Sequence, residues 1–289
     1  VSSHGIHQKR TEELQFDAGV FTNLTHDHLD YHATFKEYRD VKKSFFDSLP
    51  KSAFALVNVD DKNGEVMLQN TVATKYTYAL KTMADFKAKI IENQFSGLLL
   101  SINNQEVWTR LVGEFNVYNL TAIYGVAKLF GLETTKILTI ISQLNSVEGR
   151  FQYVTSENGV VAVIDYAHTP DALKNVLQTI QNVKNGSNKI ITVVGCGGNR
   201  DKAKRPIMGR IASQLSSQVI FTSDNPRDED PQIIIDEMEA GVEKENLNKV
   251  VQILGRSQAI KTATKLAVKG DVILIAGKGH ENYQEINGE

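Results

Sequence analysis

The second half of the chain alternates short apolar runs with amphipathic segments. Helical spacing covers 170–183, 206–215, 231–242 and 257–268. Between and around these segments lie the runs VVAVID, KIITVVG, QVIFTSD, KVVQIL and DVILIAG. Apolar strands that alternate with helices of this length form βαβ units. The pattern therefore predicts an α/β domain with a mostly parallel sheet.

The first half shows a different pattern. Apolar residues at steps of three and four give segment 34–49 one apolar helical face, and Thr34 with Glu37 fits a capping box at its start. Segments 19–24 and 53–59 are strand-like, and 75–112 combines alternating and continuous apolar runs. Helical periodicity returns over 116–130 and 134–144. This half is predicted to be a sheet with helices packed on it.

Length and composition restrict the class of protein. The 289 residues suggest two domains at roughly 150 residues each, and the change of pattern places them at 1–147 and 148–289. Hydrophobic residues make up 41% and charged residues 23%, values typical of a globular protein, and no apolar run is long enough to span a membrane. The net charge of -2 gives no sign of a nucleic-acid partner, and a single cysteine excludes an internal disulfide framework. We therefore expect a cytoplasmic enzyme.

Polar loops follow four of the predicted strands in the second half. They read DYAHTP, GCGGNRDKAKRP, TSDNPRDEDP and AGKGHE. Parallel sheets bind ligands just beyond the carboxyl ends of their strands. These four loops are therefore predicted to converge on one binding edge.

Two of these loops carry candidate ligand-binding residues. The loop GCGGNRDKAKRP does not match the G-x-G-x-x-G pattern, because Arg200 occupies the last glycine position. It also lacks the G-K-[ST] of a P-loop. Its basic residues suit a carboxylate or a phosphate, although a solvated basic helix start fits as well; they are Arg200, Lys202, Lys204 and Arg205. In the loop TSDNPRDEDP, Asp224, Asn225 and Arg227 surround Pro226. These residues can bind a small zwitterion, or they can form a turn that leads into a helix.

The amino-terminal segment suggests metal chemistry. Five of the seven histidines lie in the first 32 residues, and HDHLDYH places His28 among carboxylates, a set that suits Mg²⁺, Mn²⁺ or Zn²⁺. It also resembles the HxHxDH signature of zinc hydrolases, from which Tyr31 makes it depart. A polar loop is the plain alternative. Lys42 borders the apolar helical face, where a lysine either extends to water or has a lowered pKa and can form a carbamate with CO₂.

Taken together, nine motifs in order resemble the Mur ligases, and among them the UDP-N-acetylmuramoyl-tripeptide synthetases. They are VSSHGIHQKR, VFTNLTHDHLDYH, YRDVKKSFF, GEFNVYNLTAI, EGRFQ, IDYAHTPDAL, GCGGNRDKAKRPIMG, TSDNPRDEDP and AGKGHE. The resemblance implies a partial central ATPase domain followed by a Rossmann-like carboxyl-terminal domain. It also implies an ATP-dependent amide ligase of peptidoglycan synthesis, in which ATP phosphorylates a carboxylate and an amine attacks the acyl phosphate with Mg²⁺ present.

The resemblance also assigns roles to residues. Carbamylated Lys42 and His28 match the metal-binding pair, whose spacing of 14 residues agrees. The remaining matches are Ser2, Gln8 and Arg10 for the muramyl-peptide substrate; Asn116, Arg150 and Asp165 for ATP; and Arg200, Asp224, Asn225, Pro226, Arg227, Gly277 and Glu281 for the added amino acid.

The sequence DNPR resembles members of the family that add meso-diaminopimelate, since a guanidinium rewards the second carboxylate that lysine lacks. The expected substrate is UDP-N-acetylmuramoyl-L-alanyl-D-glutamate, and a monomer without nucleic-acid or membrane partners is expected. An L-lysine-adding homologue, a folylpolyglutamate-type ligase, a zinc hydrolase and a non-catalytic binding module are the alternatives. Because the family's P-loop and UDP-binding domain would precede Val1, we expect a fragment that is inactive on its own.

Overall fold

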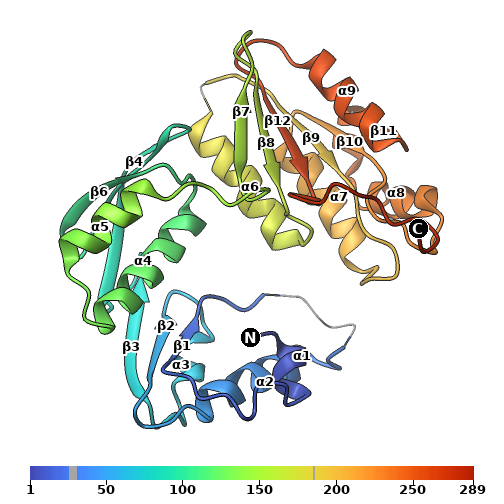
Figure 1. Cartoon of the computed structure of the whole chain (residues 1–289). Coiled ribbons are helices and arrows are strands. Elements are labelled where there is room, and N and C mark those ends of the chain that lie inside the picture. Colours follow the sequence, from blue (N-terminus) through green and yellow to red (C-terminus); the bar gives the residue numbers. More distant parts are fainter. Residues whose placement is uncertain (26–30, 185) are drawn as a thin grey trace. The chain divides into compact units, whose positions relative to one another are not determined.

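The computed structural model describes residues 1–25, 31–184 and 186–289. The chain divides into two compact units, Val1–Asn145 and Ser146–Glu289, each built on a six-stranded sheet (Figure 1). In the described residues no helix is both long enough and apolar enough to cross a membrane.

The sheet of the first unit follows the order of the chain. Its strands are β1 (Ala18–Phe21), β2 (Phe54–Asn58), β3 (Thr74–Ala79), β4 (Phe86–Gln94), β5 (Gly97–Ile102) and β6 (Gln105–Thr109). The pairs from β1 to β4 are parallel, whereas β4, β5 and β6 form an antiparallel meander. The predicted sheet with packed helices is confirmed.

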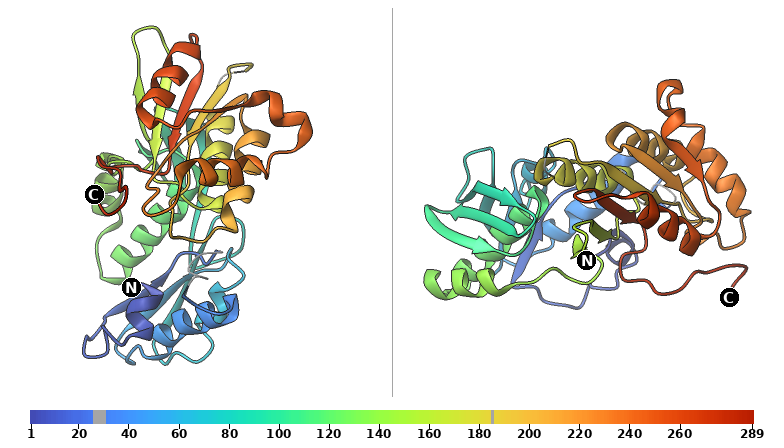
Figure 2. Two further views of the ribbon diagram at one scale, coloured as in Figure 1. Left: turned by 90° about the vertical axis from the view of Figure 1, so that its right-hand side faces the viewer. Right: turned by 90° about the horizontal axis from the view of Figure 1, so that it is seen from above.

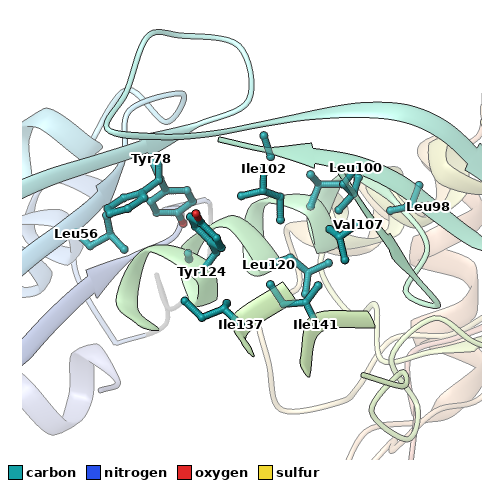
Figure 3. Packing of buried hydrophobic residues seen from close by; sticks show 14 residues of the cluster. Leu56, Tyr78, Leu98, Leu100, Ile102, Val107, Leu120, Tyr124, Ile137 and Ile141 are labelled. Atoms are coloured by element: carbon teal, nitrogen blue, oxygen red, sulfur yellow. The ribbon is translucent and has the colours of Figure 1, made fainter. Parts of the chain in front are cut away.

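Helices cover both faces of this sheet. They are α1 (Ser3–His7), α2 (Phe35–Asp47), α3 (Gly64–Met67), α4 (Glu114–Leu129) and α5 (Thr134–Gln143). Alternate residues of β2 enter different cores: Ala55 and Val57 belong to the cluster that contains α2 residues, and Leu56 belongs to the cluster formed with α4 and α5 (Figure 3). Because both faces of β2 are buried, its first four residues, Phe54 to Val57, are all apolar.

The predicted start of α2 is confirmed with one difference. Thr34 accepts a hydrogen bond from the Glu37 amide at 3.1 Å, as an N-cap does. The reciprocal bond of the capping box is made one residue earlier, since the Ala33 amide donates to the Glu37 carboxylate at 3.0 Å.

The second unit has the predicted α/β pattern. Its strands are β7 (Gln152–Thr155), β8 (Val161–Asp165), β9 (Ile190–Val194), β10 (Gln218–Phe221), β11 (Val250–Gln252) and β12 (Val272–Ala276), in the order β11-β10-β9-β12-β8-β7. All neighbours are parallel except β7, an antiparallel edge strand that the pattern did not predict. The mostly parallel sheet is therefore confirmed.

Helices pack on both sides of this sheet. They are α6 (Pro170–Val183), α7 (Lys204–Leu215), α8 (Pro231–Glu239) and α9 (Arg256–Leu266), with the short 3₁₀ helix η1 (Lys244–Lys249). Ala259 and Ala263 of α9 pack against Ile191, Val193 and Ile273, while α6, α7 and α8 lie on the opposite face (Figure 2). This arrangement leaves the carboxyl ends of the strands for the polar loops.

Candidate functional site

The loops that follow β8, β9, β10 and β12 meet at one edge of the second sheet, as predicted. Strand register explains one contact, since Asp165 at the end of β8 pairs with Ala276 at the end of β12. The next amide, that of Gly277, donates to the Asp165 carbonyl at 3.1 Å. The loops after β9 and β10 are joined by a bond of 2.8 Å from the Gly198 amide to the Asn225 carbonyl. Four polar segments thus form one site.

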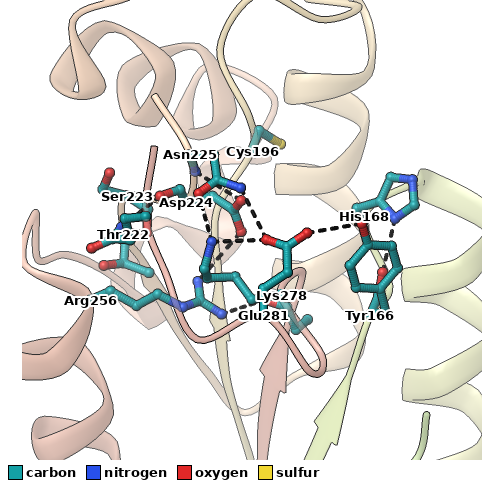
Figure 4. A network of polar contacts seen from close by, with 12 residues as sticks. Tyr166, His168, Cys196, Thr222, Ser223, Asp224, Asn225, Arg256, Lys278 and Glu281 are labelled. Carbon is teal, nitrogen blue, oxygen red and sulfur yellow. Dashed lines mark hydrogen bonds and ion pairs between the residues drawn. The ribbon is translucent and has the colours of Figure 1, made fainter. Parts of the chain in front are cut away.

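Glu281 lies at the centre of this site (Figure 4). Its Oε2 accepts hydrogen bonds of 3.0 Å from Asn225 Nδ2 and from Lys278 Nζ, and its Oε1 accepts one of 3.0 Å from the Tyr166 hydroxyl. Burial has the largest effect and raises the pKa of the carboxyl, but the three hydrogen bonds together outweigh it and leave the pKa below its ordinary value. Glu281 is therefore ionised at neutral pH.

Asp224 is the second carboxylate of the site and is 9% exposed. Its Oδ1 accepts the Asn225 amide at 2.9 Å. Its Oδ2 is buried and has no hydrogen-bond partner among the described residues, and Arg256 Nη1 is 3.8 Å away. A β-carbon on Gly277 would come within 2.7 Å of this Oδ2, so glycine keeps the space beside the carboxylate open.

Two arginines border the same site. Arg227 has a left-handed backbone (φ 53°), and its side chain donates to the Gly198 carbonyl at 2.8 Å and pairs with Glu285 at 2.9 Å. A β-carbon on Gly197 would lie 3.1 Å from Arg227 Nη1 and 3.9 Å from Arg200 Cγ. The side chains of Arg200 and Arg227 therefore pass the same glycine, and Arg200 is exposed.

The other three basic residues of this loop, Lys202, Lys204 and Arg205, make contacts within the protein. Arg205 is fully buried, and its guanidinium bonds Glu229 at 3.0 and 2.9 Å and Glu237 at 2.6 Å. Lys202 also pairs with Glu229, at 3.1 Å, and Lys204 Nζ donates to the His168 carbonyl at 2.9 Å. Arg205 and Lys202 thus pair with partly exposed carboxylates, and Lys204 ties its helix to the loop after β8.

The residues expected to contact ATP lie in both units. In the second unit, the Arg150 guanidinium stacks 4.4 Å above the Tyr166 ring. Asp165 is buried and accepts the Phe151 amide at 2.7 Å; burial raises the pKa of its carboxyl, against the opposing effects of backbone hydrogen bonds and of Arg150. In the first unit, Asn116 bonds the Val112 carbonyl at 2.8 Å in the first turn of α4.

The amino-terminal segment folds as the short helix α1. Ser2 caps it by accepting the Gly5 amide at 3.0 Å, and Gln8 donates to the Tyr31 hydroxyl at 3.4 Å. Arg10 is exposed just beyond the helix. The sequence did not predict α1, because a five-residue segment with Ile6 as its one large apolar residue shows no helical periodicity.

Lys42 lies where α2 faces α1. Its side chain is half-buried, and Nζ donates to the Val1 carbonyl at 3.4 Å and lies 6.0 Å from the Tyr38 ring centre. The lysine that α2 buries more deeply is Lys43, which pairs with Asp47 at 2.7 Å.

The other predicted metal ligand, His28, lies outside the described residues, together with His26, Asp27 and Asp30. Among the residues that are described, no three His, Cys, Asp or Glu side chains are arranged to hold a metal ion. The metal site therefore stays a prediction.

Two family models match nearly the whole chain. Residues 1–127 match the Mur ligase middle domain, and residues 149–279 match the Mur ligase glutamate ligase domain. This chain belongs to the Mur ligase family. The resemblance derived from the nine motifs is thereby confirmed, and the zinc-hydrolase alternative loses its basis.

Curated relatives and solved structures show which members of the family this chain resembles. A relative from Parabacteroides distasonis is 58% identical to this chain. It is named UDP-N-acetylmuramoyl-L-alanyl-D-glutamate--2,6-diaminopimelate ligase, and the match covers the whole of this chain and 59% of the relative. A solved structure of a ligase with the same name is 37% identical, with a TM-score of 0.62, and is covered over 60% of its length. A Mycobacterium tuberculosis folylpolyglutamate synthase, 20% identical over 92% of this chain and 62% of its own, shares the fold with a TM-score of 0.74. The chain spans about 59% of the length of the curated relatives it matches.

Three residues of the site were missed by sequence reasoning. Tyr166, Arg256 and Lys278 all contact or neighbour the predicted amino-acid residues. A lysine between two glycines directly after a buried strand was the available signal for Lys278, since its position at the binding edge was already predicted.

Proposed function

We propose that this chain is part of an ATP-dependent ligase that adds meso-diaminopimelate to UDP-N-acetylmuramoyl-L-alanyl-D-glutamate. The carrying observation is the pair of arginines beside two carboxylates: Arg200 and Arg227 flank Gly197, with Asp224 and Glu281 in the same set of loops. The names of the similar proteins point to the same reaction.

The chemistry of the pocket supports diaminopimelate over lysine. Meso-diaminopimelate carries an ammonium and a carboxylate on its distal carbon, where lysine carries the ammonium alone. An arginine fork binds a carboxylate with two parallel hydrogen bonds, and Asp224 with Glu281 offers negative charge for the ammonium. A site built this way rejects an analogue without the carboxylate, because its polar groups are left unmatched.

The residues then have distinct roles in the reaction. Arg200, Asp224, Asn225, Arg227 and Glu281 hold the distal end of the amino acid, so that the other amine points toward the acyl phosphate. That amine attacks the carbonyl carbon, loses a proton, and displaces inorganic phosphate as the amide bond forms. Pro226 and Gly277 act through the backbone: Pro226 fixes the turn that carries Arg227, and Gly277 keeps room beside Asp224.

The remaining assignments follow the family. We infer that Arg150 contacts ATP phosphate, that Asp165 and Asn116 contact its ribose and adenine, and that Ser2, Gln8 and Arg10 contact the muramyl peptide. The exposed face of the Arg150 guanidinium over Tyr166 supports the first of these.

A Mg²⁺ ion is proposed at Lys42 and His28. The Lys42 side chain, half-buried as a whole, fits this role, since a carbamate on its amine would provide the anionic oxygens that Mg²⁺ prefers. When bound, the ion would screen the repulsion between phosphate and carboxylate charges. The cytoplasmic location and the monomeric state stay predictions.

A ligation assay tests the proposed function. ATP, UDP-N-acetylmuramoyl-L-alanyl-D-glutamate and either meso-diaminopimelate or L-lysine are supplied to this chain. They are also supplied to a chimera that joins it to the parts of the Parabacteroides relative that it does not cover. We expect the chimera to release ADP and phosphate and to form the diaminopimelate product in preference. Preference for L-lysine would refute the role given to Arg227, and ATP turnover by the chain alone would refute its predicted inactivity.

A further inference from the structure

Lys278 is a buried cation inside the amino-acid site. It lies between Gly277 and Gly279 after β12 and is only 7% exposed. Its Nζ donates to Asn225 Oδ1 at 2.7 Å and to Glu281 Oε2 at 3.0 Å (Figure 4). It also lies 5.3 Å from the centre of the Tyr283 ring. A buried ammonium is retained where its donors meet acceptors, and both acceptors here belong to the proposed pocket.

The first consequence concerns the orientation of the Asn225 amide. An ammonium only donates hydrogen bonds, so it can bond the Oδ1 of Asn225 and not the Nδ2. The Glu285 amide donates to the same Oδ1 at 3.0 Å, which leaves Nδ2 directed at Glu281. The Lys278 ammonium and the Glu285 amide thus fix which of the two possible orientations the Asn225 side-chain amide adopts.

The second consequence concerns charge. Of the hydrogen bonds that lower the pKa of Glu281, the bond from Lys278 has the largest effect, followed by those from Tyr166 and Asn225. Arg256, another cation near this carboxylate, bonds the Ala276 carbonyl at 2.8 Å instead. Lys278 therefore keeps Glu281 ionised despite its burial.

We propose that Lys278 is a positioning residue of the amino-acid pocket, which holds Asn225 and Glu281 in the arrangement that receives the distal ammonium and carboxylate of the substrate. This inference rests on the proposed function for the identity of the ligand. The positioning itself can be measured without any ligand.

The first arm of the test uses NMR on the ligand-free chain. Lys278→Met is compared with Lys265→Met, which alters an exposed lysine of α9. We expect the side-chain amide of Asn225 to lose its protection from exchange, and the pKa of Glu281 to rise, in Lys278→Met alone. Asn225 and Glu281 signals that are unchanged in Lys278→Met would overturn the proposal.

The second arm measures the binding of meso-diaminopimelate by titration calorimetry. Because Lys278→Met leaves buried polar partners unmatched, we expect binding to weaken about tenfold or more, with Lys265→Met unchanged. Lys278→Cys should be equally weak until bromoethylamine converts the thiol to a lysine isostere, which should restore affinity. The native Cys196 is also buried, so the unaltered chain treated with the same reagent controls for its modification.

The outcomes are separable. Full affinity in Lys278→Met, or no recovery after complete aminoethylation, would overturn the role of Lys278. Absence of meso-diaminopimelate binding by the unaltered chain would instead refute the proposed function of this pocket, and the NMR arm would still decide whether Lys278 holds Asn225 and Glu281.

Discussion

Replacing Arg227 by alanine tests the basis of substrate choice. The backbone at this position has φ 53°, which is equally strained for arginine and alanine because both carry a β-carbon. The change therefore removes the guanidinium without altering the conformational preference of the turn. It deletes the bond to the Gly198 carbonyl and the ion pair with Glu285.

The structure sets the expected magnitudes. The Glu285 side chain is 41% exposed and can be hydrated once its partner is gone, so the lost ion pair costs at most about 1 kcal/mol of unfolding free energy. The lost bond to Gly198 adds about 1 kcal/mol. A charge-assisted bidentate contact to a substrate carboxylate is worth about 1.5–3 kcal/mol, which corresponds to a loss in affinity of about 10- to 150-fold.

Calorimetric titration of both amino acids makes this prediction specific. Meso-diaminopimelate should bind Arg227→Ala about 10- to 150-fold more weakly, whereas L-lysine, which has no distal carboxylate, should change little. Arg210→Ala, an exposed arginine of α7, is the matched control, and thermal unfolding checks that both variants are folded. Equal losses for the two amino acids would refute the assignment of Arg227 to the second carboxylate.

Other changes probe the scaffold of the site. Arg205→Met breaks a buried ion pair and should lower the unfolding free energy in urea by about 3 kcal/mol; an unchanged midpoint would contradict the buried role. The hydrogen bonds from Arg205 hold the pKa of the Glu229 carboxyl at about 2, below the ordinary 4.5. The stabilisation of the folded state by this ion pair is therefore complete above pH 4.5 and is lost as the pH falls toward 2. Acid unfolding of Glu229→Gln should lack this component. Gly198→Ala should destabilise the unit by about 1–3 kcal/mol in the same assay, because the new β-carbon overlaps a backbone carbonyl. Tyr166→Phe should raise the pKa of Glu281 in an NMR titration while leaving nucleotide affinity unaltered; an unshifted pKa would argue against the hydroxyl contact.

Much of the fold could be predicted from local patterns. Helix α6 spans Pro170–Val183 as expected, because Thr169 caps it, Pro170 suits its first turn and its apolar stripe is continuous. Strand β7 was not predicted, since its four residues are mostly exposed and its pairing with β8 is decided by tertiary structure. Local sequence specifies elements that bury a regular face, and it specifies short edge elements poorly.

The convergence of the four loops was also predictable, because a parallel sheet places all the relevant strand ends at one edge. The contacts between particular loops could not be predicted. The pairing of Tyr166 with Glu281 depends on β12 lying beside β8, and nothing in the two separate motifs specifies that neighbourhood. Strand order is a property of the whole sheet, so contacts between loops follow only once the order is known.

The buried cations show the same limit at the level of single side chains. Arg205 and Arg200 are equally basic in the sequence, yet one is enclosed by Glu229 and Glu237 while the other is exposed. The partners of Arg205 lie 24 and 32 residues away, so its burial depends on how α7 and α8 pack. Because Arg205 also neutralises the Glu229 carboxylate that accepts the Asn199 amide, it fixes the loop from which Arg200 projects. The cluster therefore divides its charge between a structural cation that holds the loop and an exposed one that can bind a substrate.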